Sequence, residues 1–314
     1  MIYFKIKNVP IKHKGILAPM QEYTHLPFRL FCKQYNTGLT FTEMVNINHI
    51  IEYKDNLSKL SLLDSVKEES PCGVQLFGDF KNKKTIDAIK IIDEYKFFDI
   101  IDLNVGCPSP KVTGSNSGAY NLKQIDKILP IIKEAVEVTN KPITVKTRLG
   151  YSEKKIEDTF NKLIKTGISG ISIHGRLATE NYSMDARIED VLKISNNSPI
   201  PILYNGDVSE KNYFKLTDFK GLMVAREALR NPFIFKQIDY FSKEGKLLEK
   251  ENFKIQLNLF LKYLEKYPIS FQKMKVSVIP FLKGEEGCAK FRDSISKSKT
   301  KEELIKILDK LIKQ

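Results

Sequence analysis

Long apolar runs are missing from this chain of 314 residues. No stretch approaches the roughly 18 consecutive apolar residues that a membrane span needs. The opening segment MIYFKIKNVPIKHKG interleaves lysines with apolar residues instead of forming the apolar core of a secretory signal. The sequence therefore predicts a protein without a membrane segment and favours a cytoplasmic location.

Cysteine is also scarce, with four residues at positions 32, 72, 107 and 288. They form no Cys-x-x-Cys pair, and no histidine stands at a metal-ligand spacing, so neither a zinc site nor a disulfide framework is expected. A Gly-x-Gly-x-x-Gly motif after the first expected strand is missing too. Its absence weakens the case for a doubly wound dinucleotide-binding fold.

Positive charge, by contrast, is in excess. The 51 Lys and Arg residues against 38 Asp and Glu give a formal net charge of +13. Clustered Lys and Arg bind polyanions by displacing counterions from phosphates, so RNA, DNA and an anionic membrane are all candidate partners. The alternative is compositional, because the chain is rich in Lys, Ile and Asn and part of the excess lysine would then be merely solvated.

Short apolar runs with β-branched residues recur along the first three quarters of the chain, each followed by an amphipathic stretch. The expected strands are 15–20, 39–45, 72–78, 100–107, 143–149, 170–176, 201–208 and 221–227. Between them lie helical patterns such as 126–139, with its apolar residues on one face and its proline near the first turn. This alternation predicts the α/β class and a (β/α)8 TIM barrel over residues 1–239.

After about residue 240 only helical patterns remain, which predicts a small all-helical domain over 240–314. Its last segment has Thr300 three residues before Glu303, a capping-box spacing, and then an apolar stripe of Leu304, Ile307, Leu308 and Leu311. The region holds 17 Lys and Arg against 10 Asp and Glu. Because it carries over half of the net charge, it is the expected polyanion-binding element.

Polar side chains gather where the expected strands end. In a barrel these ends form one face, and that face is the catalytic one. The residues concerned are Glu43, Gln75, Asn104, Cys107, Lys146, Arg148, His174, Arg176, Asn205, Asp207 and Arg226, and the apolar Met20 lies at the same level.

Cys107 lies between Gly106 and Pro108, ahead of the Gly- and Ser-rich segment SPKVTGSNSGAY, which could move as a lid. A lone cysteine at a strand end is more often a small buried apolar residue than a catalyst. Here the fixed backbone and the adjoining loop favour a functional thiol. A thiol can donate a proton or, once ionised, act as a nucleophile, and both roles remain open at this point.

Basic side chains alternate along two neighbouring expected strands. Lys146 and Arg148 share one side of the first, and His174 and Arg176 repeat the spacing on the second. Buried cations need a partner, so the pattern predicts an anionic or electron-rich ligand between them. The alternative is an ion pair with a barrel carboxylate such as Glu43 or Asp102.

The seventh and eighth expected strands end in YNGDV and VAREALRNPF. In many barrels these two loops, with a helix N-terminus, bind a phosphate group. Gly206 would permit close approach of the backbone, and Arg226 could hold the phosphate with two hydrogen bonds.

A series of ordered motifs now gives a resemblance that covers nearly the whole chain. They are APM, LPFR with TEMV, LNVGCP, VKTRLG, IHGR, NGDV, AREALRNPFIF and FLKGEEGCAKFR. Together they resemble the tRNA-dihydrouridine synthases of bacteria and archaea, flavin-dependent barrels that reduce uridine in tRNA. The resemblance implies FMN as cofactor, NADPH as reductant and tRNA as partner, with no metal, and a monomer is favoured.

The resemblance also implies a role for each matching residue. Pro19, Met20 and Gln21 would lie along the flavin ring, with Gln75 and Lys146 at its polar edge. The ribityl chain and phosphate would be held by His174, Asn205, Gly206, Asp207, Ala225 and Arg226. Asn104, Arg148 and Arg176 would contact the substrate, and Cys107 would be the catalytic proton donor.

The chain departs from the family pattern at three places. It has Ala225 before Arg226 where a Gly-Arg pair is usual, His25 where Asp is common, and GAYNLK without the usual apolar run. Two other functions remain open, an FMN barrel that acts on a free pyrimidine such as dihydroorotate and an RNA-binding barrel without catalysis. The basic helical region argues against the first, and the retention of Cys107, Lys146 and His174 argues against the second.

Overall fold

In the computed structural model of this chain, which describes residues 2–313, eight parallel strands form the centre of the molecule. They are β3 (Gly15–Leu17), β4 (Thr40–Asn46), β5 (Cys72–Phe77), β6 (Ile100–Asn104), β7 (Ile143–Arg148), β8 (Gly170–His174), β9 (Ile202–Asn205) and β10 (Gly221–Val224). Their order is β3-β10-β9-β8-β7-β6-β5-β4, and a 2.9 Å backbone bond from Leu17 to Leu39, beside β4, closes the barrel. The predicted TIM barrel is confirmed.

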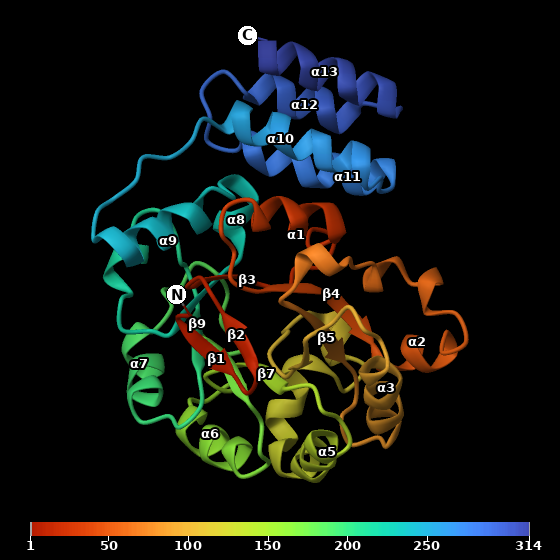
Figure 1. Ribbon diagram of the computed structural model, residues 1–314, viewed down its shortest axis with the longest axis vertical. Helices are drawn as coiled ribbons and strands as arrows, with labels where there is room; N and C mark the ends of the chain where they lie inside the picture. Colours follow the sequence, from red (N-terminus) through yellow and green to blue (C-terminus); the bar gives the residue numbers. More distant parts are fainter. Residues whose placement is uncertain (1, 314) are drawn as a thin grey trace.

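Helices alternate with these strands and surround them (Figure 1). They are α1 (Leu26–Lys33), α2 (Ile47–Glu52), α3 (Lys84–Asp93), α4 (Pro110–Thr113), α5 (Ile125–Glu137), α6 (Ile156–Ile164), α7 (Ile188–Asn196), α8 (Arg226–Arg230) and α9 (Ile234–Glu244). Short 3-10 helices occur at Leu57–Lys59, Ser61–Leu63, Lys67–Glu69, Gly118–Gln124, Tyr213–Lys215 and Ile279–Leu282.

Helix α5 has the predicted apolar face, but its proline lies deeper than the sequence indicated. Ile128, Ile132 and Ala135 are fully buried. Pro130 is inside the helix rather than near its first turn, because α5 begins already at Ile125. The proline is on the exposed side, where water can satisfy the carbonyl group that it leaves without a partner.

A hairpin that the sequence did not predict covers one end of the barrel. Strands β1 (Phe4–Ile6) and β2 (Val9–Ile11) pair antiparallel and lie across the barrel opening that faces the viewer in Figure 1. Phe4, Ile6 and Ile11 are buried in a cluster with Ile16 and Phe41 of the barrel. Lys5 is the outward residue of β1, and Lys7 and Lys12 are exposed beside the strands. Lys14 is buried instead, and its Nζ donates to the Thr217 carbonyl oxygen at 2.6 Å.

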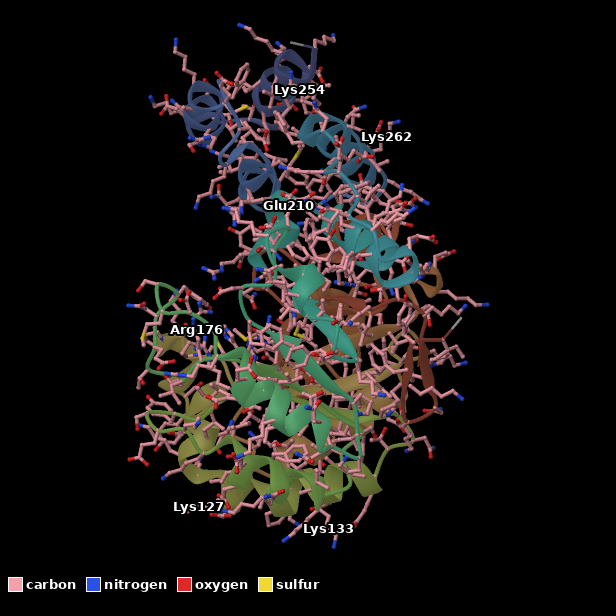
Figure 2. All side chains as sticks on the ribbon, turned by 90° about the vertical axis from the view of Figure 1, so that its left-hand side faces the viewer. Lys127, Lys133, Arg176, Glu210, Lys254 and Lys262 are labelled. Atoms are coloured by element: carbon pink, nitrogen blue, oxygen red, sulfur yellow. The ribbon has the colours of Figure 1, made fainter. Side chains whose placement is uncertain are left out.

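Four helices, α10 (Phe253–Lys266), α11 (Phe271–Val278), α12 (Ala289–Lys297) and α13 (Lys301–Lys313), form a helical region at one end of the molecule. Figure 1 shows them beyond α1 and α8, and Figure 2 shows them at the end opposite Lys127 and Lys133. The predicted cap of α13 is present, since the Glu303 amide donates to Thr300 Oγ1 at 3.2 Å. None of the helices within residues 2–313 is long and apolar enough to cross a membrane.

The predicted division after residue 239 falls within α9. This helix continues to Glu244, and its residues Ile234, Phe235 and Ile238 are buried. Phe235 lies against β3, where a Cβ atom added to Gly15 would be 2.8 Å from its ring. α9 therefore packs as part of the barrel, and the connection over 245–252 leads from it to α10.

Helix α1 lies between the barrel and the helical region. Every residue from Leu26 to Cys32 is buried. Phe28 and Phe31 contact the ring of Phe260 in α10, with centroids 5.6 and 5.3 Å apart. Because α1 is enclosed on all sides, it joins the two parts through an apolar core rather than through a surface contact.

His25 caps α1 and is buried at this junction. Its Nδ1 accepts the Phe28 amide at 3.4 Å, and its Nε2 lies 2.8 Å from Ser277 Oγ in α11. The Ser277 hydroxyl donates to the Lys273 carbonyl, so the ring donates from Nε2. Burial, with Lys273 and Arg29 nearby, lowers the pKa of His25 to about 3. The imidazole is therefore neutral when the protein is folded.

We expect His25 to make the protein less stable in mild acid. Unfolded His has a pKa of about 6.5, so between pH 7.5 and 5 the unfolded chain gains a proton that the folded chain excludes. The expected cost is about 2 kcal/mol of unfolding free energy. The variant His25→Asn keeps a cap acceptor. Between these two pH values its free energy of unfolding should fall by about 2 kcal/mol less than that of the parent protein, as measured by urea unfolding. His49→Asn, at an exposed histidine, is the control, and equal pH dependence of all three proteins would contradict the assignment.

Candidate active site

A cavity of about 470 Å³ opens at the carboxyl ends of the barrel strands. Of the predicted site residues, its wall contains Pro19, Met20, Gln21, Gln75, Asn104, Cys107, Lys146, Arg148, His174, Asn205, Gly206, Asp207, Ala225 and Arg226. The remaining one, Arg176, is not part of the lining. Residues from 19 to 226 thus meet in one place because parallel strands end at the same face of a barrel.

Strand register explains why these side chains are neighbours. Asn104 of β6 is paired with Lys146 of β7, and Arg148 of β7 is paired with His174 of β8. His174 is in turn paired with Asn205 of β9. Polar side chains of four adjacent strands therefore lie close together at the level of the cavity.

Asn104 fixes the backbone that carries Cys107. Its Oδ1 accepts the amide of Gly106 at 3.1 Å and the amide of Cys107 at 2.9 Å. A Cβ atom at Gly106 would lie only 3.1 Å from the backbone of Thr147, so the turn runs close to β7. Cys107 itself is partly exposed, lines the cavity and has a free thiol.

The segment after Cys107 is packed against it. The Ala119 amide donates to the Cys107 carbonyl at 2.9 Å. Gly118 has a φ of 58°, and a Cβ atom there would be 2.6 Å from that same carbonyl oxygen. Glycine at 118 therefore allows the loop to close over the cysteine turn.

A chain of buried hydrogen bonds orients the Asn104 side chain. Asn104 Nδ2 donates to Gln75 Oε1 at 2.8 Å, and Gln75 Nε2 donates to Asp102 at 2.7 Å. Thr144 donates to the other Asp102 oxygen at 2.6 Å. Burial raises the pKa of Asp102 to about 6, although the bonds from Thr144 and Gln75 oppose the shift. Because an ionised carboxylate only accepts, Asp102 sets the orientation of the Gln75 amide.

Lys146 and Arg148 share one side of β7, as their spacing predicted. Lys146 Nζ donates to Asn205 Oδ1 at 3.0 Å, and burial and Arg148 lower the pKa of Lys146 to about 8. Arg148 donates to the carbonyl oxygens of Gly106 at 3.0 Å and Leu177 at 2.7 Å. Arg148 therefore also holds the cysteine turn.

Within residues 2–313, Lys146 and Arg148 form no ion pair with a barrel carboxylate. The alternative does hold for Arg176, which is paired with Asp207. Asp102 accepts from Thr144 and Gln75. Glu43 is paired with Lys273 of α11. The positive charges of Lys146 and Arg148 thus remain available to the cavity.

Arg176 lies behind the cavity wall and orients two of its residues. Its side chain is 1% exposed, its Nη1 lies 3.1 Å from His174 Nε2, and it forms an ion pair with Asp207. A guanidinium only donates, so His174 Nε2 accepts. Burial, followed by Lys146 and other cations, holds the pKa of His174 far below its usual value. The ring is therefore neutral, with its proton on Nδ1.

Tyr182 belongs to the cavity wall although the sequence gave no motif for it. Its ring is 4.4 Å from the guanidinium carbon of Arg226, and its centroid is 6.1 Å from that of His174. The only available signal was its position in the loop after β8, since loops at this face of a barrel carry function. Figure 2 shows this loop on the side of the barrel where Arg176 is labelled.

The outer part of the cavity suits an anion. Gly206 has a φ of 141°, and a Cβ atom there would be 2.6 Å from the Cβ of Ala186, so only glycine fits. Arg226 and Arg230 both line the cavity and are largely exposed. Asp207 accepts from Arg226 at 2.7 Å and so orients its guanidinium group.

Metal ligands do not cluster here. No group of three or more His, Cys, Asp or Glu side chains within residues 2–313 is arranged to hold a metal ion.

Comparison with solved structures gives the same fold. An old yellow enzyme homologue from Zymomonas mobilis superposes with a TM-score of 0.50 at 10% identity, covering 85% of this chain and 98% of the other. The Amycolatopsis orientalis BexX/CysO complex gives a TM-score of 0.50 at 12% identity, covering 86% and 98%. At such low identity the likeness concerns the fold alone.

Comparison of sequences is more specific. Residues 16–314 match the family model described as dihydrouridine synthase. A probable tRNA-dihydrouridine synthase of Aquifex aeolicus is 30% identical over 310 residues, covering 95% of this chain and 96% of the relative. The tRNA-dihydrouridine synthase B of Vibrio vulnificus is 32% identical over 247 residues, covering 77% and 76%. This chain therefore belongs to the dihydrouridine synthase family.

Proposed function

We propose that this protein is a tRNA-dihydrouridine synthase that reduces the bond between carbons 5 and 6 of uridine in tRNA. The proposal includes FMN as the cofactor, NADPH as the reductant and Cys107 as the proton donor. Its main support is the joint occurrence of family membership and a cavity in which Cys107 faces the same space as Lys146, Arg148 and His174.

The cavity has a composition that fits FMN. Its volume of about 470 Å³ is within the usual range for cofactor sites. Apolar side chains for a flat ring are Pro19, Met20, Met44 and Met223. Gln75 and Lys146 would bind the polar edge of the ring, while Gly206 and Arg226 would receive the phosphate. FMN, when bound, would supply the hydride.

Cys107 would supply the proton. Hydride addition at carbon 6 of uracil leaves negative charge on carbon 5 and on the adjoining carbonyl group. A neutral thiol can transfer its proton to carbon 5 as this charge develops, and solvent then restores the thiol proton. Asn104 and Arg148 hold the cysteine turn in place, so the donor is positioned before the substrate arrives.

Cations in the cavity would stabilise the same charge. Lys146 and Arg148 have no carboxylate partner among the described residues and line the cavity beside Cys107. Fixed positive groups in an enclosed site stabilise developing negative charge more strongly than water does. Arg176 would contribute by positioning His174 and Asp207, because its buried location is unsuited to the predicted contact with substrate.

The substrate would reach the site with its target base turned out of the tRNA stack, since an enzyme cannot reach carbon 5 inside a stacked helix. The helical region would hold the rest of the tRNA, given that residues 253–313 have 14 Lys and Arg against 7 Asp and Glu.

We expect unmodified tRNA incubated with this protein, FMN and NADPH to acquire dihydrouridine, detected by mass spectrometry of its nucleosides. Reactions without NADPH or with protein stripped of FMN are the controls and should give none. A protein that binds FMN and oxidises NADPH but yields no dihydrouridine would contradict the proposal and would direct attention to free pyrimidines.

A further inference from the structure

The turn formed by residues 20–25 connects β3 to α1 and borders the cavity through Met20 and Gln21. Glu22 within it has a φ of 69°, a conformation that residues other than glycine adopt at a cost. The amide of Glu22 donates to Glu43 Oε2 at 2.7 Å, and Gln21 Nε2 donates to the same oxygen at 2.9 Å. The Glu43 carboxylate therefore holds the 20–25 turn in its strained form.

Glu43 itself depends on the helical region. Its side chain is 1% exposed, and a buried carboxylate is costly unless a cation compensates it. Among the described residues, the cation that forms an ion pair with Glu43 is Lys273, whose Nζ lies 2.9 Å from Oε1. Lys273 belongs to α11, in a part of the chain far from β4 in sequence.

A second contact joins the same helix to the same turn. Ser277 is one helical turn after Lys273, so the two side chains lie on one face of α11. Its hydroxyl oxygen is 2.8 Å from His25 Nε2, at the end of the 20–25 turn. α11 thus contacts the turn through His25 directly and through Glu43 indirectly.

We propose that Lys273 is a positioning residue for the cofactor site: through Glu43 it holds the 20–25 turn, and with it Met20 and Gln21, in the conformation that binds FMN. The inference rests on the proposed function for the identity of the ligand. It gives the helical region a second task besides binding tRNA, since displacement of α11 would separate Lys273 from Glu43 and weaken the cofactor site.

The test is the affinity of the intact, FMN-stripped protein for FMN, measured by quenching of flavin fluorescence. We expect Lys273→Met to bind FMN about tenfold more weakly or worse, because it leaves the Glu43 carboxylate buried without its cation. Lys262→Met makes the same change of charge on α10. Lys262 is exposed, as Figure 2 shows, so this control should bind within about twofold of the parent protein.

A double variant tests whether Lys273 acts through the charge of Glu43 or only helps to attach the helical region to the barrel. In Glu43→Gln with Lys273→Met, no buried charge is left unpaired, and the Gln oxygen can still accept from Gln21 and Glu22. We expect its FMN affinity to return to within about threefold of the parent. Circular dichroism and thermal unfolding without FMN show whether each variant is folded.

Two results would overturn the inference. One is a folded Lys273→Met protein whose FMN affinity equals that of the parent, even if its Tm is lower. The other is a double variant that binds FMN as weakly as Lys273→Met. If the parent protein itself does not bind FMN, it is the proposed function that fails.

Discussion

Replacement of Cys107 by alanine is expected to reduce dihydrouridine formation by about 100-fold or more while FMN affinity stays unchanged. The change removes the proposed proton donor and nothing that shapes the turn, because Asn104 and Arg148 bind backbone atoms of residues 106 and 107. The measurements are nucleoside mass spectrometry of the tRNA product and an FMN titration.

The reductive half of the reaction provides an internal control. Oxidation of NADPH by FMN-loaded Cys107→Ala should proceed at the rate of the parent, since the thiol has no proposed part in it. The rate at which tRNA reoxidises the reduced flavin should fall instead. Cys107→Ser keeps a weaker acid at the same place and should be intermediate. Unchanged turnover of tRNA by Cys107→Ala would refute the role of this thiol.

The barrel and most of its cavity could be predicted from the sequence because two local signals agree. Apolar runs separated by amphipathic stretches predict alternating strands and helices, and parallel strands place their carboxyl ends together. Gln75 and Lys146 lie in the second half of β5 and β7, and Asn205 ends β9. Their meeting therefore follows from topology without knowledge of any contact. The bounds of the strands were less certain, since residues such as Arg176 continue the pattern of β8 after the strand has ended at His174.

Contacts between distant segments were not accessible in this way. Tyr182 reaches the cavity from an irregular loop, and no periodicity marks it. Glu43 was expected at the catalytic face, but nothing in the sequence marks Lys273 as its partner, because only the docking of α11 on the barrel brings the two together. The N-terminal hairpin was missed because its strands are only three residues long, too short for an alternation to be distinguished from chance.

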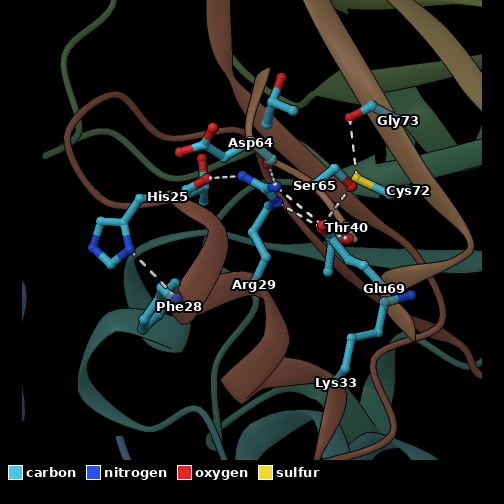
Figure 3. Close-up of polar contacts among 12 residues, drawn as sticks. His25, Phe28, Arg29, Lys33, Thr40, Asp64, Ser65, Glu69, Cys72 and Gly73 are labelled. Carbon is cyan, nitrogen blue, oxygen red and sulfur yellow. Dashed lines mark hydrogen bonds and ion pairs between the residues drawn. The ribbon is translucent and has the colours of Figure 1, made fainter. Parts of the chain in front are cut away.

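Arg29 is a charged residue whose burial could not be predicted from the sequence. In a short helix an arginine is usually solvated, yet Arg29 is 1% exposed because α1 lies between the barrel and the helical region. Figure 3 shows its guanidinium group directed at Glu69. The Nε to Oε1 distance is 2.5 Å, and the Nη2 to Oε2 distance is 3.0 Å. Arg29 also donates to the carbonyl oxygen of Thr24, in the 20–25 turn, at 2.8 Å.

We expect Arg29→Met to lower the free energy of unfolding by about 3 to 5 kcal/mol. Methionine fills much of the space but leaves the Glu69 carboxylate buried without its cation. The double variant with Glu69→Met should recover part of the loss, because two apolar residues leave no buried charge, although Thr40 and Ser65 then lose their acceptor. Urea unfolding at pH 7 measures both.

The pH dependence of the free energy of unfolding shows whether Arg29→Met is destabilised by an unpaired Glu69 charge or by loss of packing. In the parent, burial alone would raise the pKa of Glu69, but Arg29 and hydrogen bonds outweigh it and hold the pKa below its usual value. The stabilisation from Glu69 is thus present above its unfolded pKa of about 4.3 and is lost as the pH falls through the lower folded value. Without Arg29, burial raises the pKa of Glu69, and a raised carboxyl pKa favours the folded state in acid. The stability gap between parent and Arg29→Met should therefore narrow from pH 7 to pH 5, whereas a packing defect would leave it constant.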